Sequence, residues 1–340
     1  MKVLTVAVPA YNSESCIQKC LDSFVESDVL PELEVIIIND GSGDGTLGIA
    51  RDYERRFPES VRVIDKENGG HGSGINAASA AAVGKYFQVV DSDDWVITEN
   101  LPKFLAALRE TEADIVLANY HMVNMVSGRR QPFSTEGVEL NREFDIEEFL
   151  SYPARTKSCC YFHGVIYRTE FYRKTGIKLS EKIFYEDQEY ATLPFYYAHS
   201  ILPTDIFVYQ YLVGNTEQSI SSANQAKNMW QIEKVLHVLI SFYDAHRDMP
   251  AGKKSYFLFK LSGFLTSYYA AGLLKCADRK RGREDARRMR SEVRSVCPEL
   301  YRASEKNYQV AMALHRLHIS SAMLEKAKDT SLYYLIRKKL

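Results

Sequence analysis

The stretch Gln88-Val89-Val90-Asp91-Ser92-Asp93-Asp94-Trp95 joins an apolar run to three closely spaced carboxylates. Valine favours the interior of a sheet, whereas aspartate is rarely buried unless it is paired or holds a metal. We therefore expect a buried strand that ends here, at solvent or at a cation. Oxygen ligands at this spacing suit Mg²⁺ or Mn²⁺, although Asp-Asp before a helix is also ordinary N-terminal capping.

Three earlier apolar runs also end in polar or glycine-rich segments. They cover residues 3–8, 34–38 and 61–64. Each is followed by a segment with helical spacing, and this alternation predicts an α/β fold with a mixed, mainly parallel sheet and flanking helices. Ligands of open α/β sheets gather at the carboxyl ends of strands, so we expect the polar segments to surround one crevice. These segments contain Tyr11, Asp40, residues 68–76 and residues 91–94.

Residues 67–76 read Glu-Asn-Gly-Gly-His-Gly-Ser-Gly-Ile-Asn and precede an alanine-rich helix expected over residues 77–83. A glycine-rich turn before a helix lets backbone N–H groups approach an anion closely. The segment is therefore a candidate phosphate-binding turn.

The residue pattern of the sequence changes near residue 225. Long helical patterns with few Gly or Pro follow, over residues 229–243, 254–276, 284–296 and 308–324. Apolar residues at helical spacing predict an α-helical region. We therefore expect an α/β domain over residues 1–220 and a helical C-terminal domain over residues 221–340.

The net charge of −1 gives no general attraction to nucleic acid. Residues 275–294 nevertheless hold nine Lys or Arg against four acids, and Arg337-Lys338-Lys339 lies near the end. Such a basic face could contact an anionic membrane, although most such runs are solvated helix surface. The six cysteines lack CxxC spacing, and no apolar run approaches the ~20 residues of a membrane span. We expect a cytoplasmic protein, soluble or peripheral on the inner face of the cell membrane.

Taken in order, the motifs resemble a family 2 glycosyltransferase of the GT-A fold over roughly residues 1–222. They are Val8-Pro9-Ala10-Tyr11-Asn12, residues 39–46, residues 68–76, Gly84-Lys85-Tyr86, Asp91-Ser92-Asp93-Asp94, Glu186-Asp187 and Gln218-Ser219-Ile220-Ser221. The resemblance implies inverting transfer of a sugar from a nucleotide donor, usually UDP-linked, with a divalent cation, Mn²⁺ or Mg²⁺.

The same resemblance implies the roles of individual residues. The donor-binding residues would be Pro9, Tyr11, Asn12, Asp40, Asn68, Gly70, His71, Asn76, Asp91 and Ser92. Asp93 would bind the cation with Asp91 as its partner, and Asp187 would act as the base of the Glu186-Asp187 pair. A metal that stabilises the leaving diphosphate and a carboxylate that removes the acceptor proton suit this chemistry. Asp94 is then expected to cap the following turn.

Some positions depart from the pattern of the family. Ile75 stands where many relatives carry an arginine, and His71 could substitute for its phosphate contact, although a lone histidine is more often structural. His163 could be a third metal ligand, but packing beneath the site is favoured. The Gln-x-x-Arg-Trp motif of processive synthases is absent, which argues against a channel-forming synthase.

The leading hypothesis is transfer of a hexose-type sugar from a UDP-sugar to a lipid-linked saccharide or a cell-surface polysaccharide precursor. One alternative is a glycolipid synthase that acts on a membrane lipid such as diacylglycerol. A nucleotidyltransferase is less favoured, because its glycine-rich phosphate signature does not follow the first strand. A sugar-binding module without catalysis is the remaining alternative.

Overall fold

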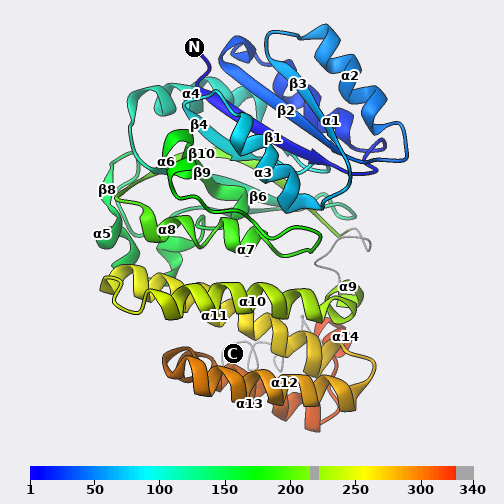
Figure 1. Ribbon diagram of the computed structural model, residues 1–340, viewed down its shortest axis with the longest axis vertical. Coiled ribbons are helices and arrows are strands. Elements are labelled where there is room, and N and C mark those ends of the chain that lie inside the picture. The colour runs from blue at the N-terminus through cyan, green and yellow to red at the C-terminus, as the bar shows by residue number, and fades with distance from the viewer. Residues whose placement is uncertain (215–221, 327–340) are drawn as a thin grey trace. The chain divides into compact units, whose positions relative to one another are not determined.

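The computed structural model describes residues 1–214 and 222–326 (Figure 1). The chain divides into two compact units, Met1–Gly214 with Pro250–Lys253 and Asn215–Met249 with Lys254–Leu340. The boundary expected between residues 220 and 221 lies outside the described residues. The same holds for the motif at residues 218–221 and the basic residues 337–339.

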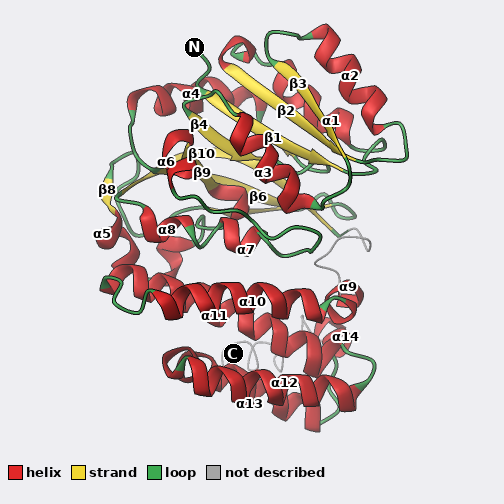
Figure 2. Ribbon diagram, in the orientation of Figure 1, coloured by secondary structure: helices red, strands yellow, loops and turns green. Residues whose placement is uncertain are grey.

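The first unit is built on one ten-stranded sheet flanked by helices (Figure 2). Its strands are β1 (Leu4–Ala10), β2 (Leu33–Asp40), β3 (Val61–Lys66), β4 (Tyr86–Val89), β5 (Trp95–Val96), β6 (Ile115–Asn124), β7 (Arg130–Phe133), β8 (Phe144–Asp145), β9 (Val165–Arg168) and β10 (Ser200–Val213). The strand order is β3-β2-β1-β4-β9-β6-β10-β5, with β7 paired to β6 and β8 paired to β10.

The order of the strands reverses at β1. This strand pairs in parallel with β2 on one side and with β4 on the other, so the chain crosses the sheet between β3 and β4. β9 runs antiparallel between β4 and β6, which makes the sheet mixed as expected. A reversal of strand order opens a crevice at the carboxyl ends of the strands, where the acidic stretch begins.

The helices of the first unit follow most of the expected spacing. They are α1 (Ile17–Val25), α2 (Thr46–Arg56), α3 (His71–Ala81), α4 (Leu101–Glu110), α5 (Ile146–Ser151), α6 (Thr169–Lys174), α7 (Asp187–Tyr190) and α8 (Pro194–Tyr197). α1 buries Ile17, Leu21 and Phe24, which are spaced as on one face of a helix.

The glycine-rich segment is not the open turn that the sequence suggested. α3 begins at His71, six residues before the expected start, so the loop itself ends at Gly70, whose φ is +83°. Local propensity disfavours helix at Gly72 and Gly74. Glycine is required at Gly72 because a neighbouring segment approaches it closely: an added Cβ there would lie 2.3 Å from the Ser180 carbonyl oxygen.

The second unit is helical, as expected from its long helical patterns with few Gly or Pro. Its helices are α9 (Ser222–Lys227), α10 (Met229–Ala245), α11 (Ala251–Ala270), α12 (Arg279–Val296), α13 (Pro298–Arg316) and α14 (Ser321–Lys326). The single helix expected over residues 308–324 is wrong, because α13 ends at Arg316 and His318 has a φ of +58°. No helix in the described ranges has the length and apolarity that crossing a bilayer requires.

Candidate active site

Three side chains that could hold a metal meet beyond the end of β4. The ligand atoms of Asp91, Asp94 and His163 all lie within 4.8 Å of one another. Two carboxylates and an imidazole suit Mn²⁺, and Mg²⁺ accepts the oxygens. Burial, followed by the charges of Asp91 and Asp93, raises the pKa of Asp94 well above its usual range. A divalent cation would relieve this repulsion, so the residues fit such an ion.

The carboxylates of this trio are not the two that were expected to bind the metal. Asp91 belongs to it as expected, but its second carboxylate comes from Asp94 and not from Asp93. Asp93 is partly exposed, and its charge is felt at Asp94. A metal contact from Asp93 therefore stays a prediction.

Asp94 does not cap the turn that follows it. Its carboxylate is 1% exposed and accepts hydrogen bonds from the Tyr209 hydroxyl at 2.6 Å and from the Leu212 backbone N–H at 2.7 Å. The Tyr209 oxygen also accepts from the Asp91 backbone N–H at 3.1 Å. The capping prediction is wrong because β10 returns beside the acidic loop, and its donors take both oxygens of Asp94.

His71 joins the two acidic motifs. Its Nδ1 lies 2.5 Å from Oε1 of Glu186, and its Nε2 lies 2.9 Å from Oδ1 of Asp91. Burial opposes protonation of the imidazole, but the two carboxylates outweigh it and raise the pKa of His71 well above its usual range. Both ring nitrogens therefore have carboxylate partners, and the arrangement places the Glu186 segment beside the Asp91 loop.

Glu186 and Asp187 differ in their access to solvent. Glu186 is 2% exposed, and its Oε2 has no hydrogen-bond partner among the described residues. Asp187 is partly exposed at the start of α7, and its Oδ2 accepts a hydrogen bond from the Gln188 side chain at 2.8 Å. Of the two, Asp187 is the carboxylate that a substrate hydroxyl can reach.

Several of these carboxylates act electrostatically on one side chain, Tyr211. After burial, the charges of Asp94, Asp91 and Asp187 raise the pKa of its hydroxyl. The His163 ring stacks on Tyr211 with centroids 3.9 Å apart, so it packs in the site while its ring nitrogens stay candidates for a metal. Burial lowers the pKa of His163 to about 4, which leaves the neutral imidazole that metals bind.

Tyr209 and Tyr211 were not among the expected site residues. Side chains alternate along a strand, so two tyrosines separated by one residue share a face. The Tyr209-Gln210-Tyr211 pattern could have indicated them, once β10 was known to run beside β4 and β6.

The candidate donor side lies at the ends of β1 and β2. Oδ1 of Asp40 accepts hydrogen bonds from the Lys66 ammonium at 2.7 Å and from the Gly69 N–H at 2.9 Å, and Oδ2 accepts from the Gly70 N–H at 2.8 Å. The Asn68 amide donates to the Asp40 carbonyl at 2.9 Å. Asp40 therefore holds the turn that leads into α3, and its expected role in donor binding stays a prediction.

Other expected donor-side residues connect neighbouring loops. Asn12, with φ +50°, accepts a hydrogen bond from the Gly43 N–H at 2.8 Å and so joins the loops after β1 and β2. Tyr11 is 55% exposed, which leaves its ring open to stack on a base. Pro9 is buried within β1, and the Ser92 hydroxyl lies 2.8 Å from that of Ser13.

Asn76 anchors a segment that follows α6. Its side-chain oxygen accepts from the Leu179 N–H at 2.9 Å, and its amide donates to the Leu179 carbonyl at 3.0 Å and to Glu181 at 3.1 Å. The structure thus gives Asn76 a positioning role, and its expected donor contact stays a prediction.

Comparison with known proteins gives a family and several relatives. Residues 5–176 match the profile described as Glycosyl transferase family 2. The uncharacterized glycosyltransferase EpsJ of Bacillus subtilis is 30% identical over 213 residues, which cover 62% of this chain and 60% of that protein. The poly(ribitol-phosphate) beta-N-acetylglucosaminyltransferase TarS of Staphylococcus aureus is 26% identical over 254 residues, which cover 73% of this chain and 43% of that protein. The chain thus spans less than two thirds of the length of these relatives.

Solved structures share the fold. The crystal structure of TarS residues 1–349 from S. aureus superposes with a TM-score of 0.61 at 22% identity and covers 94% of this chain and 92% of that one. The mannosyltransferase PcManGT of Pyrobaculum calidifontis, solved with GDP-Man and Mn²⁺, gives a TM-score of 0.50 at 19% identity. The match covers 92% of this chain and 86% of that one. The expected GT-A fold is confirmed.

Proposed function

The chain belongs to glycosyl transferase family 2, and we propose that it is an inverting glycosyltransferase that moves a hexose-type sugar from a UDP-sugar to a saccharide acceptor. The acceptor class would be a lipid-linked saccharide or a cell-surface polysaccharide precursor. The observation that carries the proposal is the convergence of Asp91, Asp94 and His163 with the Glu186-Asp187 pair, which His71 links to Asp91. The UDP-GlcNAc complex of TarS supports the choice of donor, and the poly(ribitol-phosphate) relatives support a saccharide or polyol acceptor.

In this proposal Asp187 is the general base. Its carboxylate is partly exposed, and its charge raises the pKa of Tyr211, as do the charges of Asp94 and Asp91. It would take the proton of the acceptor hydroxyl while that oxygen attacks the anomeric carbon opposite the leaving UDP, which inverts the configuration. Glu186 would not touch the substrate, because it is buried and held by His71.

A divalent cation, Mn²⁺ or Mg²⁺, would be held by Asp91, Asp94 and His163, with Asp93 as a further candidate ligand. When bound, it supplies positive charge that stabilises the diphosphate leaving group. The chain prepares these ligands itself, since Tyr209 and Leu212 fix Asp94 and His71 fixes Asp91.

The test is release of UDP from a panel of UDP-hexoses with Mn²⁺. Asp187→Asn should lower turnover roughly 10²- to 10⁴-fold, the usual contribution of a general base. Asp91→Asn should do the same through the metal, whereas the exposed Asp28→Asn should match the wild type. Full turnover in Asp187→Asn would contradict the assigned mechanism.

A glycolipid synthase remains the second candidate. The observation that favours it is a pair of exposed cations on α12, Lys280 and Arg287, which have no ion-pair partner within the described ranges. Sugar transfer to diacylglycerol in anionic vesicles, compared with transfer to a water-soluble oligosaccharide, separates the two acceptors.

A further inference from the structure

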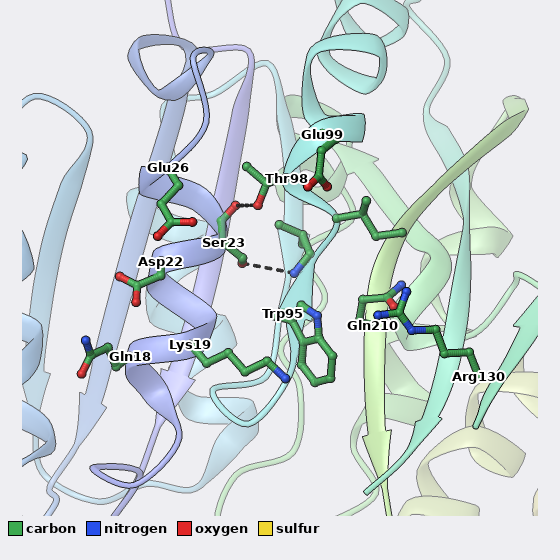
Figure 3. Close-up of a pocket in the computed structure, with 12 residues that line it drawn as sticks. Gln18, Lys19, Asp22, Ser23, Glu26, Trp95, Thr98, Glu99, Arg130 and Gln210 are labelled. Atoms are coloured by element: carbon green, nitrogen blue, oxygen red, sulfur yellow. Dashed lines mark hydrogen bonds between the residues drawn. The ribbon is translucent and has the colours of Figure 1, made fainter. Parts of the chain in front are cut away.

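A cavity of about 640 Å³ lies in the first unit, lined by residues of α1, β5, β7 and β10 (Figure 3). Side chains alternate along a strand. Tyr209 and Tyr211 contact Asp94 and His163, and Gln210, which stands between the two tyrosines, lines the cavity. The acidic loop divides in the same way, because Asp94 faces β10 while the next residue, Trp95, lines the cavity.

Two cations without carboxylate partners meet in this cavity. Lys19 reaches in from α1 and Arg130 from β7, with Trp95 between them in Figure 3. The Lys19 ammonium lies 2.9 Å from the centroid of the Trp95 ring, and neither cation forms an ion pair within residues 1–214 and 222–326. Burial lowers the pKa of Lys19, the nearby charge of Arg130 lowers it further, and the charge of Asp94 opposes both. An anion that contacts both cations would relieve their repulsion.

A buried acceptor in the wall of the cavity lacks a donor. Gln210 is 1% exposed, and its amide nitrogen donates to the Tyr209 carbonyl at 2.9 Å and lies 2.9 Å from Nδ1 of His121. Its Oε1 accepts no hydrogen bond from any residue that the structure describes. Buried polar atoms are almost always satisfied, so the donor to this oxygen would be a water or a ligand group.

The far part of the cavity carries groups of another kind. Asp22, Glu26 and Glu99 line it (Figure 3). The carboxylates of Glu26 and Glu99 are exposed, whereas that of Asp22 accepts a hydrogen bond from the Tyr53 hydroxyl. Carboxylates accept hydrogen bonds from hydroxyl groups, and an indole ring packs against the apolar face of a sugar. The cavity thus combines an anion-binding end, an aromatic surface and hydroxyl acceptors.

We propose that this cavity binds a phosphate-bearing saccharide at a site separate from the transfer site. The phosphate contacts Lys19 and Arg130 along one edge of the Trp95 ring, the carbon face of the sugar packs on Trp95, and its hydroxyls donate to Glu26 and Glu99. Identifying this ligand with the acceptor rests on the proposed function, whereas the binding site itself does not. As part of an acceptor chain, the bound unit would keep that chain on the enzyme between transfers.

Tryptophan fluorescence can report on this site. The chain has two tryptophans, and Trp230 is 57% exposed in the second unit, so Trp230→Phe leaves Trp95 as the only reporter. In this background glucose 6-phosphate should change the fluorescence saturably, whereas glucose should not. A phosphodiester-linked oligosaccharide that binds more tightly than glucose 6-phosphate assigns the site to a polymer, and equal affinity assigns it to free phosphosugars.

Arg130→Gln should weaken the binding of glucose 6-phosphate about tenfold, the cost of one charge-assisted hydrogen bond. Lys19→Gln should have a similar effect. Arg129→Gln, at the neighbouring exposed arginine, is the matched control and should leave the affinity unchanged. Circular dichroism of each variant shows that it is folded.

Three results would overturn the proposal. They are no saturable signal with either phosphate ligand, an unchanged affinity in both Arg130→Gln and Lys19→Gln, and binding of UDP or inorganic phosphate as tight as that of glucose 6-phosphate. UDP release by the Trp230→Phe protein is measured separately. If glucose 6-phosphate binds but no donor releases UDP, the proposed function is rejected and the binding site is kept. If UDP is released but glucose 6-phosphate does not bind, the binding site is rejected and the proposed function is kept.

Discussion

The three aspartates of the acidic loop have different surroundings although only three positions separate the first from the last. Asp91 contacts His71, and Asp94 is fixed by Tyr209 and Leu212. Asp93 stays partly exposed between them. The Asp94 N–H donates to the Asp91 carbonyl at 3.0 Å, and this turn directs neighbouring side chains to different parts of the fold.

His71 provides a residue-scale prediction. His71→Phe would leave the buried Glu186 carboxylate without its partner at Oε1. Breaking a buried ion pair from one side costs roughly 3–5 kcal/mol, so the free energy of unfolding should fall by about that amount. Urea denaturation in EDTA measures it. His71→Gln, which can still donate a hydrogen bond, should recover part of the loss, and equal stability of His71→Phe and the wild type would contradict the inferred bridge.

At the scale of elements, α3 depends on glycines that propensity alone would exclude. An added Cβ on Gly72 would meet the Ser180 carbonyl at 2.3 Å and the Glu186 side chain at 2.8 Å. The absence of a side chain therefore lets the segment before α7 approach α3, and this brings Glu186 within reach of His71.

A pair of glycine substitutions tests this. Gly72→Ala should lower the free energy of unfolding by roughly 1–3 kcal/mol, because overpacking outweighs the better helix propensity of alanine. Gly48→Ala in α2 is the matched control, since nothing lies within 4 Å of its added Cβ. It should leave stability unchanged or raise it by up to about 1 kcal/mol. Gly72→Ala should also reduce UDP release. If Gly72→Ala and Gly48→Ala both raise the free energy of unfolding, α3 is not closely packed at Gly72.

An ion pair between α12 and α13 gives a pH dependence. The Arg290 guanidinium donates to both oxygens of Glu305, at 2.8 and 2.7 Å, and lowers the pKa of that carboxyl. A depressed folded-state pKa stabilises the protein above the unfolded pKa of about 4.3 and loses that effect as pH falls through the folded pKa. The stability difference between wild type and Glu305→Gln should therefore be present at neutral pH and disappear in acid. A difference that grows on acidification would have the wrong sign.

At the scale of the whole molecule, the basic stretch of the sequence is less uniform than its composition suggests. Arg288 forms an ion pair with Glu233, and Arg290 forms one with Glu305. Part of the positive charge is therefore neutralised by carboxylates of the second unit. Lys280 and Arg287 are exposed and form no ion pair among the described residues. Any contact with an anionic membrane would have to use such cations.

Vesicle flotation tests this membrane contact. If α12 binds anionic lipid, the double variant Lys280→Gln with Arg287→Gln should lose about 2 kcal/mol of binding free energy, at about 1 kcal/mol per cation. Arg55→Gln with Lys174→Gln removes two exposed cations from the first unit and is the charge-matched control. Binding that persists in the double variant, or that does not weaken with salt, would rule out α12 as the contact.

The sequence by itself determined the order of buried strands, most of the helices and the family motifs, because apolar periodicity and turn residues act within a few positions. Only the tertiary structure decided that Asp94 is bound by β10 and that His71 joins Asp91 to Glu186. His71 and Glu186 are 115 residues apart, as are Asp94 and Tyr209. Their contacts arise from the strand order β4-β9-β6-β10 and from close approach at Gly72, and local propensity contains no information about either. The sequence thus singled out the acidic loop, but only the fold gave Asp91 and Asp94 their partners.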